Sequence, residues 1–250
     1  MSTPAIELID VTAGYAGRPV QNHVSFQIGQ GEIVALLGGS GCGKSTMLKT
    51  IIGLLPVIDG DVRIAGESLV LCNQIKKREI LRKFGVAFQN GALFRSYTLA
   101  ENIALPLQEY TDLPQEEIDK IVEEKLRIVG LEGAGKKMPG DLSGGMVKRG
   151  AVARALALNP GIIFLDEPSA GLDPLNSANL DQLILDIRKK FNSTIMIVTH
   201  ELDSIFTVAD RAIFLDSKGG GILAQGTPEE LRDHCENPFV RNFLNRGKDK

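Results

Sequence analysis

Nine consecutive residues, GGSGCGKST at positions 38–46, carry the most specific chemistry in the sequence. Gly38, Gly43, Lys44 and Ser45 match the spacing G-x-x-x-x-G-K-[ST], between a predicted strand and a predicted helix. Glycines let backbone N–H groups surround phosphates without clashes from Cβ atoms. Lys44 supplies a point charge for the β- and γ-phosphates, and Ser45 supplies a hydroxyl for Mg²⁺. The motif therefore predicts a site for nucleotide phosphates.

Polar residues also follow three further apolar segments of the sequence. Asp166 and Glu167 end GIIFLDE, Gln89 follows GVAF, and His200 follows IMIVT. Because ligands of open α/β sheets bind at the carboxyl ends of the strands, we expect these side chains to converge on one γ-phosphate. Asp166 is suited to hold Mg²⁺ through water, and Glu167 is suited to polarise an attacking water. Taken singly, an acid pair at a strand end is commonly only solvated, and a lone histidine is more often structural.

A second glycine turn opens another predicted helix, in DLSGGMVKRGAVARALALNP. Ser143 is a suitable N-cap, a role in which serine is favoured over alanine by about 1 kcal/mol. Gly144 and Gly145 would equally leave backbone N–H groups free at a helix N-terminus, which is an anion site. These residues alone do not decide between a plain helix cap and a second phosphate site.

The elements that must position these residues follow from the apolar patterns. Strands are predicted at IELIDV, HVSFQI, EIVALL, GDVRIAG, KFGVAFQ, GIIFLD and TIMIVTH, and a hairpin at RAIFLDSKGGGILAQG. Helices are predicted from Lys44 to about Leu54, from Pro114 to Val129 and around 180–191. Thr227, Pro228 and Glu230 form the pattern of a capping box. Strands that alternate with helices predict an α/β core with a parallel sheet, and about 90–158 is predicted to be a helical insertion.

Composition narrows the function classes. The chain has 250 residues, 43% hydrophobic and 24% charged, as in soluble globular proteins. A net charge of −3 gives no reason to expect nucleic acid as a partner. No apolar run approaches the roughly 20 residues that span a bilayer, and MSTPAIELIDV lacks the features of a signal peptide. Cys42, Cys72 and Cys235 show no metal spacing, which favours a reducing cytosol.

The motifs, in their order along the chain, resemble the ATPase subunit of ABC transporters. LSGGM, RGAVARALALNPGIIFLDEPSAGLDP and VTHE carry the resemblance, which extends from Tyr15 to about residue 232. It implies an α/β P-loop NTPase fold of the ABC type, with an N-terminal antiparallel β region and a helical insertion. It also implies one domain over 1–250, with a helical subdomain at about 90–158 and a polar tail at about 245–250.

The resemblance also implies that two copies of the chain form a head-to-tail dimer. In this family the P-loop of one subunit and the signature turn of the other close over the same ATP. Ser143, Gly144 and Gly145 would then bind the γ-phosphate held by the other subunit, and Asp173 would make a contact across the dimer. Since the chain has one P-loop and one signature turn, a two-fold dimer would have two composite sites.

Further roles in the implied site come from the same resemblance. Tyr15 would stack on adenine, with an ordinary loop tyrosine as the less favoured alternative. Gln89 would sense Mg²⁺ and the membrane partner, and His200 would contact the γ-phosphate. The implied catalytic residues are Glu167, His200, Lys44 and Gln89, and the implied Mg²⁺ residues are Ser45, Gln89 and Asp166. The implied ATP contacts within one subunit are Tyr15, Gly38, Gly39, Ser40, Gly41, Cys42, Gly43, Lys44, Ser45, Thr46, Gln89, Asp166 and His200.

Met146 departs from the glutamine that is commonest at its position in the family. FQNGALFRSYTLAENIALPL, MPGDLSGGM and PFVRNFL resemble the ATPase of Mla-type phospholipid transporters, which serve MCE-domain systems at the bacterial cell envelope. This closer resemblance implies membrane permease subunits as partners, with MCE-domain and STAS-like subunits beside them. It places the chain on the cytoplasmic side of the inner membrane as a peripheral protein.

Other functions stay open at this point. The chain could power an ABC transporter for another substrate, because the sequence names neither cargo nor direction. A soluble ABC scaffold or nucleic-acid machine is the less favoured alternative. Such proteins carry two motif sets or a long coiled coil, and no sustained heptads lie between Lys44 and Leu142. A GTPase would need a guanine-reading N-K-x-D, which the sequence lacks.

Overall fold

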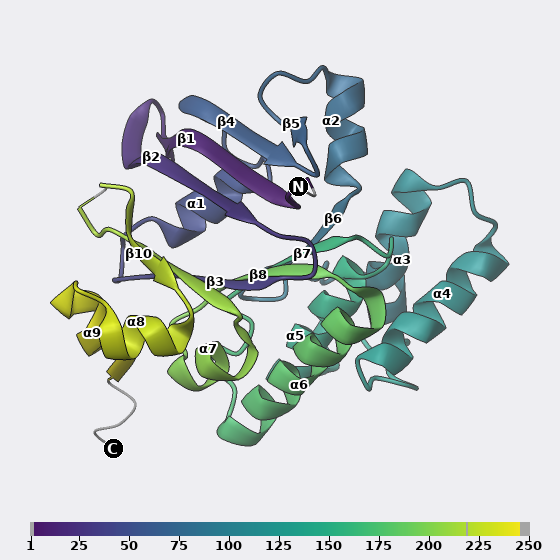
Figure 1. The fold of residues 1–250 in the computed structure, drawn as a ribbon. Helices are drawn as coiled ribbons and strands as arrows, with labels where there is room; N and C mark the ends of the chain where they lie inside the picture. The colour runs from purple at the N-terminus through teal and green to yellow at the C-terminus, as the bar shows by residue number, and fades with distance from the viewer. Residues whose placement is uncertain (1–2, 219, 246–250) are drawn as a thin grey trace.

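The structure is a computed structural model that describes residues 3–218 and 220–245 (Figure 1). Its strands are β1 (Ile6–Tyr15), β2 (Arg18–Ile28), β3 (Ile33–Gly38), β4 (Asp59–Ile64), β5 (Glu67–Ser68), β6 (Phe84–Ala87), β7 (Ile162–Asp166), β8 (Thr194–Val198), β9 (Arg211–Leu215) and β10 (Ile222–Gly226). Its helices are α1 (Lys44–Ile51), α2 (Gln74–Leu81), α3 (Leu99–Tyr110), α4 (Gln115–Ile128), the 3₁₀ turn η1 (Pro139–Asp141), α5 (Gly144–Ala155), α6 (Pro174–Phe191), α7 (Leu202–Val208), α8 (Pro228–His234) and α9 (Pro238–Asn245).

The larger sheet has the strand order β10-β9-β3-β8-β7-β6, and all its neighbours are parallel except the β9–β10 hairpin. β3 and β8 are buried along their whole length, which explains their unbroken apolar sequences. Successive residues of a strand alternate between two cores. One core holds Ile163 and Leu165 with α3 to α6, and the other holds Phe164 with α1 and the N-terminal strands (Figure 1). The predicted parallel α/β core is confirmed.

The smaller sheet is antiparallel, in the order β2-β1-β4-β5, and it packs over α1. The predicted N-terminal antiparallel region is therefore confirmed. Both of its first strands are longer than the apolar patterns indicated. β1 runs on through a polar stretch to Tyr15, which pairs with Arg18 at the hairpin. Cross-strand pairing carries these polar residues into the strands, and periodicity alone does not detect that.

Helices α3, α4 and α5 lie between residues 90 and 158, and no strand lies in that range. α3 begins with a capping box of Thr98 and Glu101, and its apolar face packs on α4 and α5. The fully buried Lys125 of α4 donates to Asn159 Oδ1 at 2.6 Å, which attaches α4 to the segment after α5. The helical insertion is where the sequence predicted it. The division into a single domain with a helical subdomain stays a prediction.

Several boundaries differ from the predictions. α1 ends at Ile51 rather than about Leu54, and Asn245 ends α9 rather than starting a polar tail. Helices α2, α7 and α9 were not predicted, because each has eight residues or fewer and so offers only about two turns of pattern. α9 is fixed by edge-on contacts of Phe239 and Phe243 with Phe214. The predicted capping box of α8 is confirmed, and residues 246–250 of the predicted tail lie outside the described residues.

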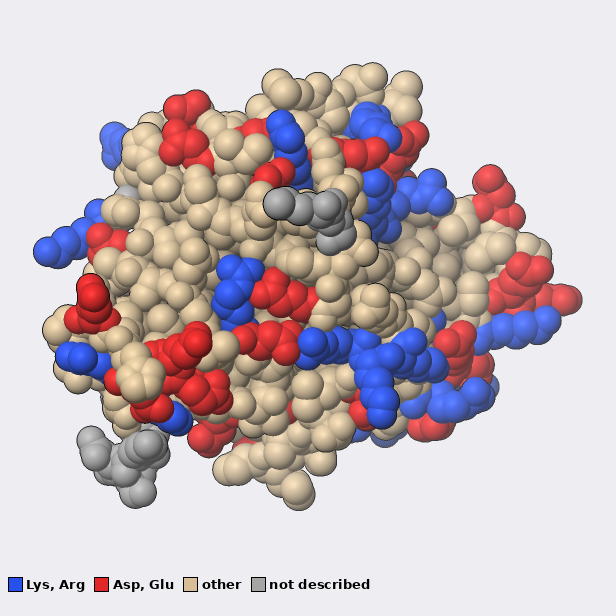
Figure 2. Space-filling view, viewed as in Figure 1, with Lys and Arg blue, Asp and Glu red and all other residues tan. Residues whose placement is uncertain are grey.

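None of the described helices is long and apolar enough to cross a membrane. On the face drawn in Figure 2, acidic and basic side chains are interspersed, and neither sign covers the face alone. Some charged side chains of the protein pair across elements, as Arg211 does with Glu32 and Arg188 with Asp210.

Candidate functional site: the phosphate loop and the strand ends around it

Residues 38–43 form a tight loop between β3 and α1. Gly38 has φ of 152° and Gly43 has φ of 98°, in the region where side chains are strained. A Cβ on Gly43 would lie 2.8 Å from Val20 Cγ1, and one on Gly38 would lie 2.5 Å from Cys42 Sγ. Only glycine fits at these two positions, so the loop can hold its N–H groups at the start of α1. This is the geometry that the sequence motif predicted.

Lys44 is the first residue of α1, and its half-buried side chain folds back along the loop. Its Nζ donates to Gly38 O at 2.9 Å and to Gly39 O at 3.1 Å. A hollow of about 350 Å³ opens beside it, lined by Val20, Gly41, Gly43, Lys44, Ser45 and Thr46. The hollow is lined by the lysine, a hydroxyl and backbone of a helix N-terminus, which suits a phosphate chain. Cys42 is buried, and burial raises the pKa of its thiol.

Asp166 and Glu167 lie where β7 ends, beside the end of β8. Glu167 Oε1 lies 2.8 Å from His200 Nδ1, so the structure brings the predicted acid and the predicted histidine together. The backbone of Glu167 has φ of 46°, which is rare for a non-glycine residue. Its N–H donates to Val198 O at 2.7 Å, which fixes the turn to β8. Strained backbone of this kind is often found at functional sites.

Two buried carboxylate oxygens at this place have no hydrogen-bond partner among the described residues: Asp166 Oδ1 and Glu167 Oε2. Buried acceptors without partners are rare in native proteins. Burial raises the pKa of the Asp166 carboxyl, and the adjacent Glu167 charge raises it further. A cation on Asp166 and a water on Glu167 would satisfy both oxygens, so the residues present fit Mg²⁺ and a hydrolytic water.

Gln89 lies in the loop after β6, and its side chain is exposed. Its backbone carbonyl accepts a hydrogen bond from Lys148 Nζ, which also donates to Glu167 O at 3.0 Å. The loop of Gln89 is thus joined to the turn of Glu167. Sequence reasoning missed Lys148. The available signal was its place on the helix that follows the second glycine turn.

Tyr15 ends β1 and is 46% exposed. It belongs to the β1–β2 hairpin that brings Val20 against Gly43, but it does not line the hollow beside the phosphate loop. An exposed ring on this hairpin is compatible with stacking on a base. The stacking role of Tyr15 stays a prediction.

Ser143 caps α5, because its Oγ accepts from Met146 N at 3.3 Å. Asp173 caps α6 through Asn176, which lies 3.5 Å from where a Cβ of Gly145 would be. The second glycine turn and Asp173 are therefore neighbours on one surface. None of these residues lines the hollow at the phosphate loop. In one subunit the chemistry is split between two places, and the second phosphate-binding role stays a prediction.

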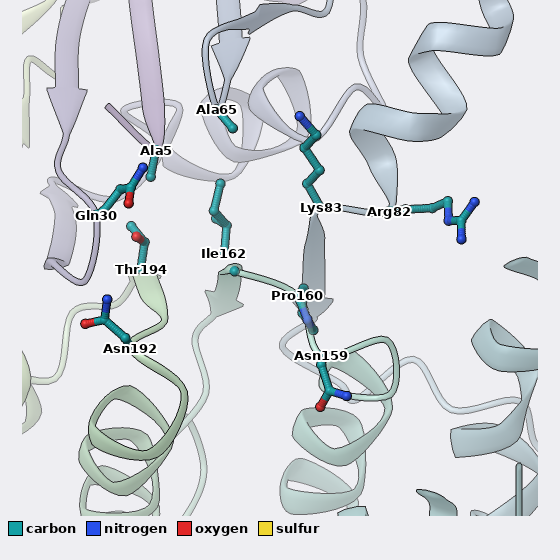
Figure 3. A pocket seen from close by; sticks show the side chains of 11 residues that line it. Ala5, Gln30, Ala65, Arg82, Lys83, Asn159, Pro160, Ile162, Asn192 and Thr194 are labelled. Carbon is teal, nitrogen blue, oxygen red and sulfur yellow. The ribbon is translucent and has the colours of Figure 1, made fainter. Parts of the chain in front are cut away.

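A separate hollow of about 350 Å³ opens at the other end of the parallel strands (Figure 3). Ile162 and Thr194, the first residues of β7 and β8, lie in its wall, together with Arg82 and Asn192. It contains none of the residues that the sequence predicted for the site. The carboxyl ends of the strands remain the candidate site.

Comparisons with known proteins agree with this geometry. The profile of the family described as "ABC transporter" matches residues 21–170. The chain is 45% identical to the "Probable ribonucleotide transport ATP-binding protein mkl" of Mycobacterium leprae, over 96% of this chain and 69% of that protein. It is 37% identical to the "Intermembrane phospholipid transport system ATP-binding protein MlaF" of Haemophilus influenzae, over 92% of this chain and 87% of that protein. Among solved structures, the dimeric post-hydrolysis state of the ATP-binding cassette MJ0796 bound to ADP and Pi is 32% identical, with a TM-score of 0.81 over 89% of this chain and 98% of that one.

Proposed function

The chain belongs to the ABC transporter family and is an ATPase of that family, and from this premise we propose that it powers a membrane transporter of phospholipid at the bacterial cell envelope. The observation that supports hydrolysis is the pair of buried, unpartnered oxygens of Asp166 and Glu167 at the end of β7. The support for phospholipid is the similarity to the phospholipid transport protein of Haemophilus influenzae over most of both chains.

Glu167 is the proposed general base for hydrolysis. Its Oε2 accepts a hydrogen bond from the water whose oxygen attacks the γ-phosphorus, and the bond from that phosphorus to the bridging oxygen of ADP breaks. The proton of the water passes toward Glu167, and ADP and inorganic phosphate are the products. His200 Nδ1, at 2.8 Å from Oε1, fixes the orientation of the carboxylate. The ring is exposed, and its Nε2, which lies 3.6 Å from Glu201 Oε1, is proposed to turn toward the γ-phosphate.

ATP phosphates are proposed to occupy the hollow at residues 38–46, with Lys44 turned from the loop carbonyls toward the β- and γ-phosphates. Ser45, Gln89 and Asp166 would hold Mg²⁺, which supplies charge neutralisation between the β- and γ-phosphate oxygens. Tyr15 would stack on the adenine. The fit for the cation rests on the unpartnered Oδ1 of Asp166.

A head-to-tail homodimer with two composite sites is part of the proposal. Ser143, Gly144, Gly145 and Asp173 share one surface, and this surface would face the nucleotide of the second copy. A Cβ on Gly144 would meet no atom within 4 Å, so backbone N–H groups there are open to approach. The dimeric state of the MJ0796 cassette supports this arrangement.

Permease subunits are the proposed membrane partners, with the chain peripheral on the cytoplasmic side of the inner membrane. MCE-domain and STAS-like subunits are proposed as further members of the complex. The relative from Mycobacterium leprae is described as a ribonucleotide transport protein, so a transporter for another substrate is the alternative function.

The test is purification of the tagged chain from membranes, followed by mass spectrometry of its partner subunits and of the lipids that they retain. We expect a permease and an MCE-domain subunit with bound phospholipid. Reconstitution of the complex in vesicles should then show transfer of a labelled phospholipid that requires ATP. Retention of nucleotides instead, with no lipid transfer, would favour the alternative substrate. A chain that hydrolyses ATP but joins no membrane subunit would contradict both transport functions.

A further inference from the structure

Lys148 occupies an unusual position between the two halves of the proposed machinery. It lies on α5, four residues after Gly144. The signature turn forms the N-terminus of the same helix. Its ammonium donates to the backbone carbonyls of Gln89 and Glu167, the latter at 3.0 Å. Among the described residues its hydrogen bonds go to these two carbonyls, and the carboxylates of Glu167 and Asp166 also attract its charge.

The carbonyl of Glu167 belongs to backbone that needs support. Glu167 has a left-handed backbone conformation, which a non-glycine residue keeps only where the surroundings hold it. Its N–H donates to Val198 O of β8, while its carbonyl accepts from Lys148 Nζ of α5 at 3.0 Å and from Ala170 N, within the same turn, at 3.3 Å. A hydrogen bond from a cation is stronger than one from a neutral donor. Ala170 closes the turn on itself, whereas Lys148 attaches the carbonyl side of the turn to helix α5.

The loop of Gln89 is attached to the same helix at a second place. The guanidinium of Arg154, near the end of α5, donates to Gly91 O at 3.1 Å and to Ala92 O at 2.7 Å. The hydrogen bonds of Arg154 go to the loop and not to the turn of Glu167, so Arg154 attaches only the loop to α5. Lys148 is the side chain that connects both the loop and the turn to α5.

We propose that Lys148 is a positioning residue that fixes Gln89 and Glu167 of its own subunit to helix α5. The signature turn and Lys148 lie on one helix. Seating of the turn on the partner's nucleotide therefore also sets the catalytic carboxylate of the chain that carries it. This inference rests on the composite sites proposed above and adds a direct link between them.

The test uses mixed dimers of the full chain, assembled with ATP and Mg²⁺ from two differently tagged copies. One copy carries Glu167→Gln, so only the site built on the P-loop of the other copy hydrolyses ATP. Lys148→Met is then placed either on the hydrolysing copy (in cis) or on the Glu167→Gln copy (in trans). Single-turnover rates are measured for both arrangements at saturating ATP.

In cis, the change should slow the single turnover by about tenfold or more, as expected for losing a charge-assisted hydrogen bond that aligns the base. In trans, the rate should stay within about threefold of the parent. A folding defect of the variant would appear in both arrangements, so equal losses would overturn the proposal. An unchanged rate in cis would overturn it as well.

Two further variants sharpen the result. Lys148→Arg retains a cation that can donate to both carbonyls and should restore most of the rate in cis. Arg149→Met removes a charge from the adjacent position, where the guanidinium contacts Val129 O and Gly130 O instead, and should leave the rate unchanged. ATP affinity should be unchanged by Lys148→Met, because Lys148 does not line the hollow at the phosphate loop. If the parent mixed dimer does not form and ATP is not hydrolysed, the composite-site function fails, and this inference fails with it.

Discussion

Lys44 shows what a single residue contributes at the phosphate loop. Its Nζ rests on the carbonyls of Gly38 and Gly39, at 2.9 and 3.1 Å, which keeps the charge beside the hollow without burying it fully. We expect Lys44→Ala to reduce ATP hydrolysis by at least about 100-fold, the range seen when one donor to a developing negative charge is removed. The measurement is phosphate release at saturating ATP.

The fold should survive this change. Lys44 is half-buried and packs on loop backbone rather than in a core, so its truncation leaves little cavity. Circular dichroism and the thermal midpoint should match the parent. Wild-type turnover in a folded Lys44→Ala protein would contradict the phosphate-loop interpretation.

At the residue scale, sequence reasoning located the groups whose chemistry is defined by their own type and spacing. Glycines at positive φ, the lysine and the strand-end acids can be recognised because a motif fixes their order. Lys148 could not be found in this way. Its role comes from the backbone carbonyls that it meets, and those belong to segments distant in the sequence. The burial of Cys42 in the core could not be predicted either, because it depends on contacts with residues distant in the sequence.

At the scale of elements, a buried contact joins α6, the helix after β7, to α7, the helix after β8. Ser204 Oγ of α7 donates to Asp181 Oδ2 of α6 at 2.9 Å, and both side chains are buried. Burial raises the pKa of Asp181, the Ser204 bond lowers it in part, and Asp203 raises it. α7 follows His200, so this contact helps to place the helix next to the catalytic histidine.

A pH dependence of stability follows from Asp181. The folded protein binds this proton more tightly than the unfolded chain, so stability is lost as pH rises above the ordinary aspartate value of 3.8. Asp181→Asn cannot titrate, and it should lose less stability over that interval. Between pH 4 and pH 7, the thermal midpoints of the parent and of Asp181→Asn should diverge by on the order of 2 °C. Asp186→Asn, on the exposed side of α6, is the control and should follow the parent curve.

The loop before α3 is the expected contact of the permease. Phe94 and Tyr97 are 52% and 40% exposed, and their rings lie 5.8 Å apart. The apolar side chains of Leu93 and Leu99 in the same segment are less available, because Leu99 is fully buried and Leu93 is half-buried against the helical core. We therefore expect Phe94→Asp to abolish co-purification of the permease while ATP binding persists. Leu93→Asp should do so too, but with a loss of stability.

The control for this contact is Ile9→Asp, which charges a comparably exposed apolar side chain on β1. It should leave co-purification intact. Full recovery of the permease with Phe94→Asp would place the contact elsewhere.

Long elements such as α4 and α6 could be predicted from their periodicity, whereas α2, α7 and α9 depend on tertiary contacts that a short sequence window does not contain.

At the scale of the whole molecule, one subunit carries two separated half-sites. The hollow at the phosphate loop contains the cationic and hydroxyl groups, and the surface of Ser143 and Asp173 lies apart from it. The order of the motifs predicted this arrangement only through resemblance to a family, because the composite site depends on a second copy. The serine also acts as a helix cap, so both functions that the sequence allowed for it can be tested together.

Glu167→Gln should accumulate a closed dimer with ATP and Mg²⁺. The amide keeps the shape of the side chain but cannot accept the proton of the attacking water. Nucleotide should still bind, because the groups that hold its phosphates are unchanged. Light scattering after size exclusion should show dimer with ATP and monomer without it. A monomer under both conditions, with nucleotide bound, would contradict the composite site.

Adding Ser143→Arg to Glu167→Gln should undo that dimer. The larger side chain would occupy the place of the partner's γ-phosphate, while the phosphate loop of the same chain remains able to bind nucleotide. Loss of the cap costs about 1 kcal/mol of helix stability, so Ser143→Ala with Glu167→Gln serves as the matched control. The control should still dimerise on ATP, because the N–H groups of Gly144 and Gly145 remain. If the arginine variant dimerises as well as Glu167→Gln alone, Ser143 is only a helix cap, and the second glycine turn does not bind the partner's nucleotide.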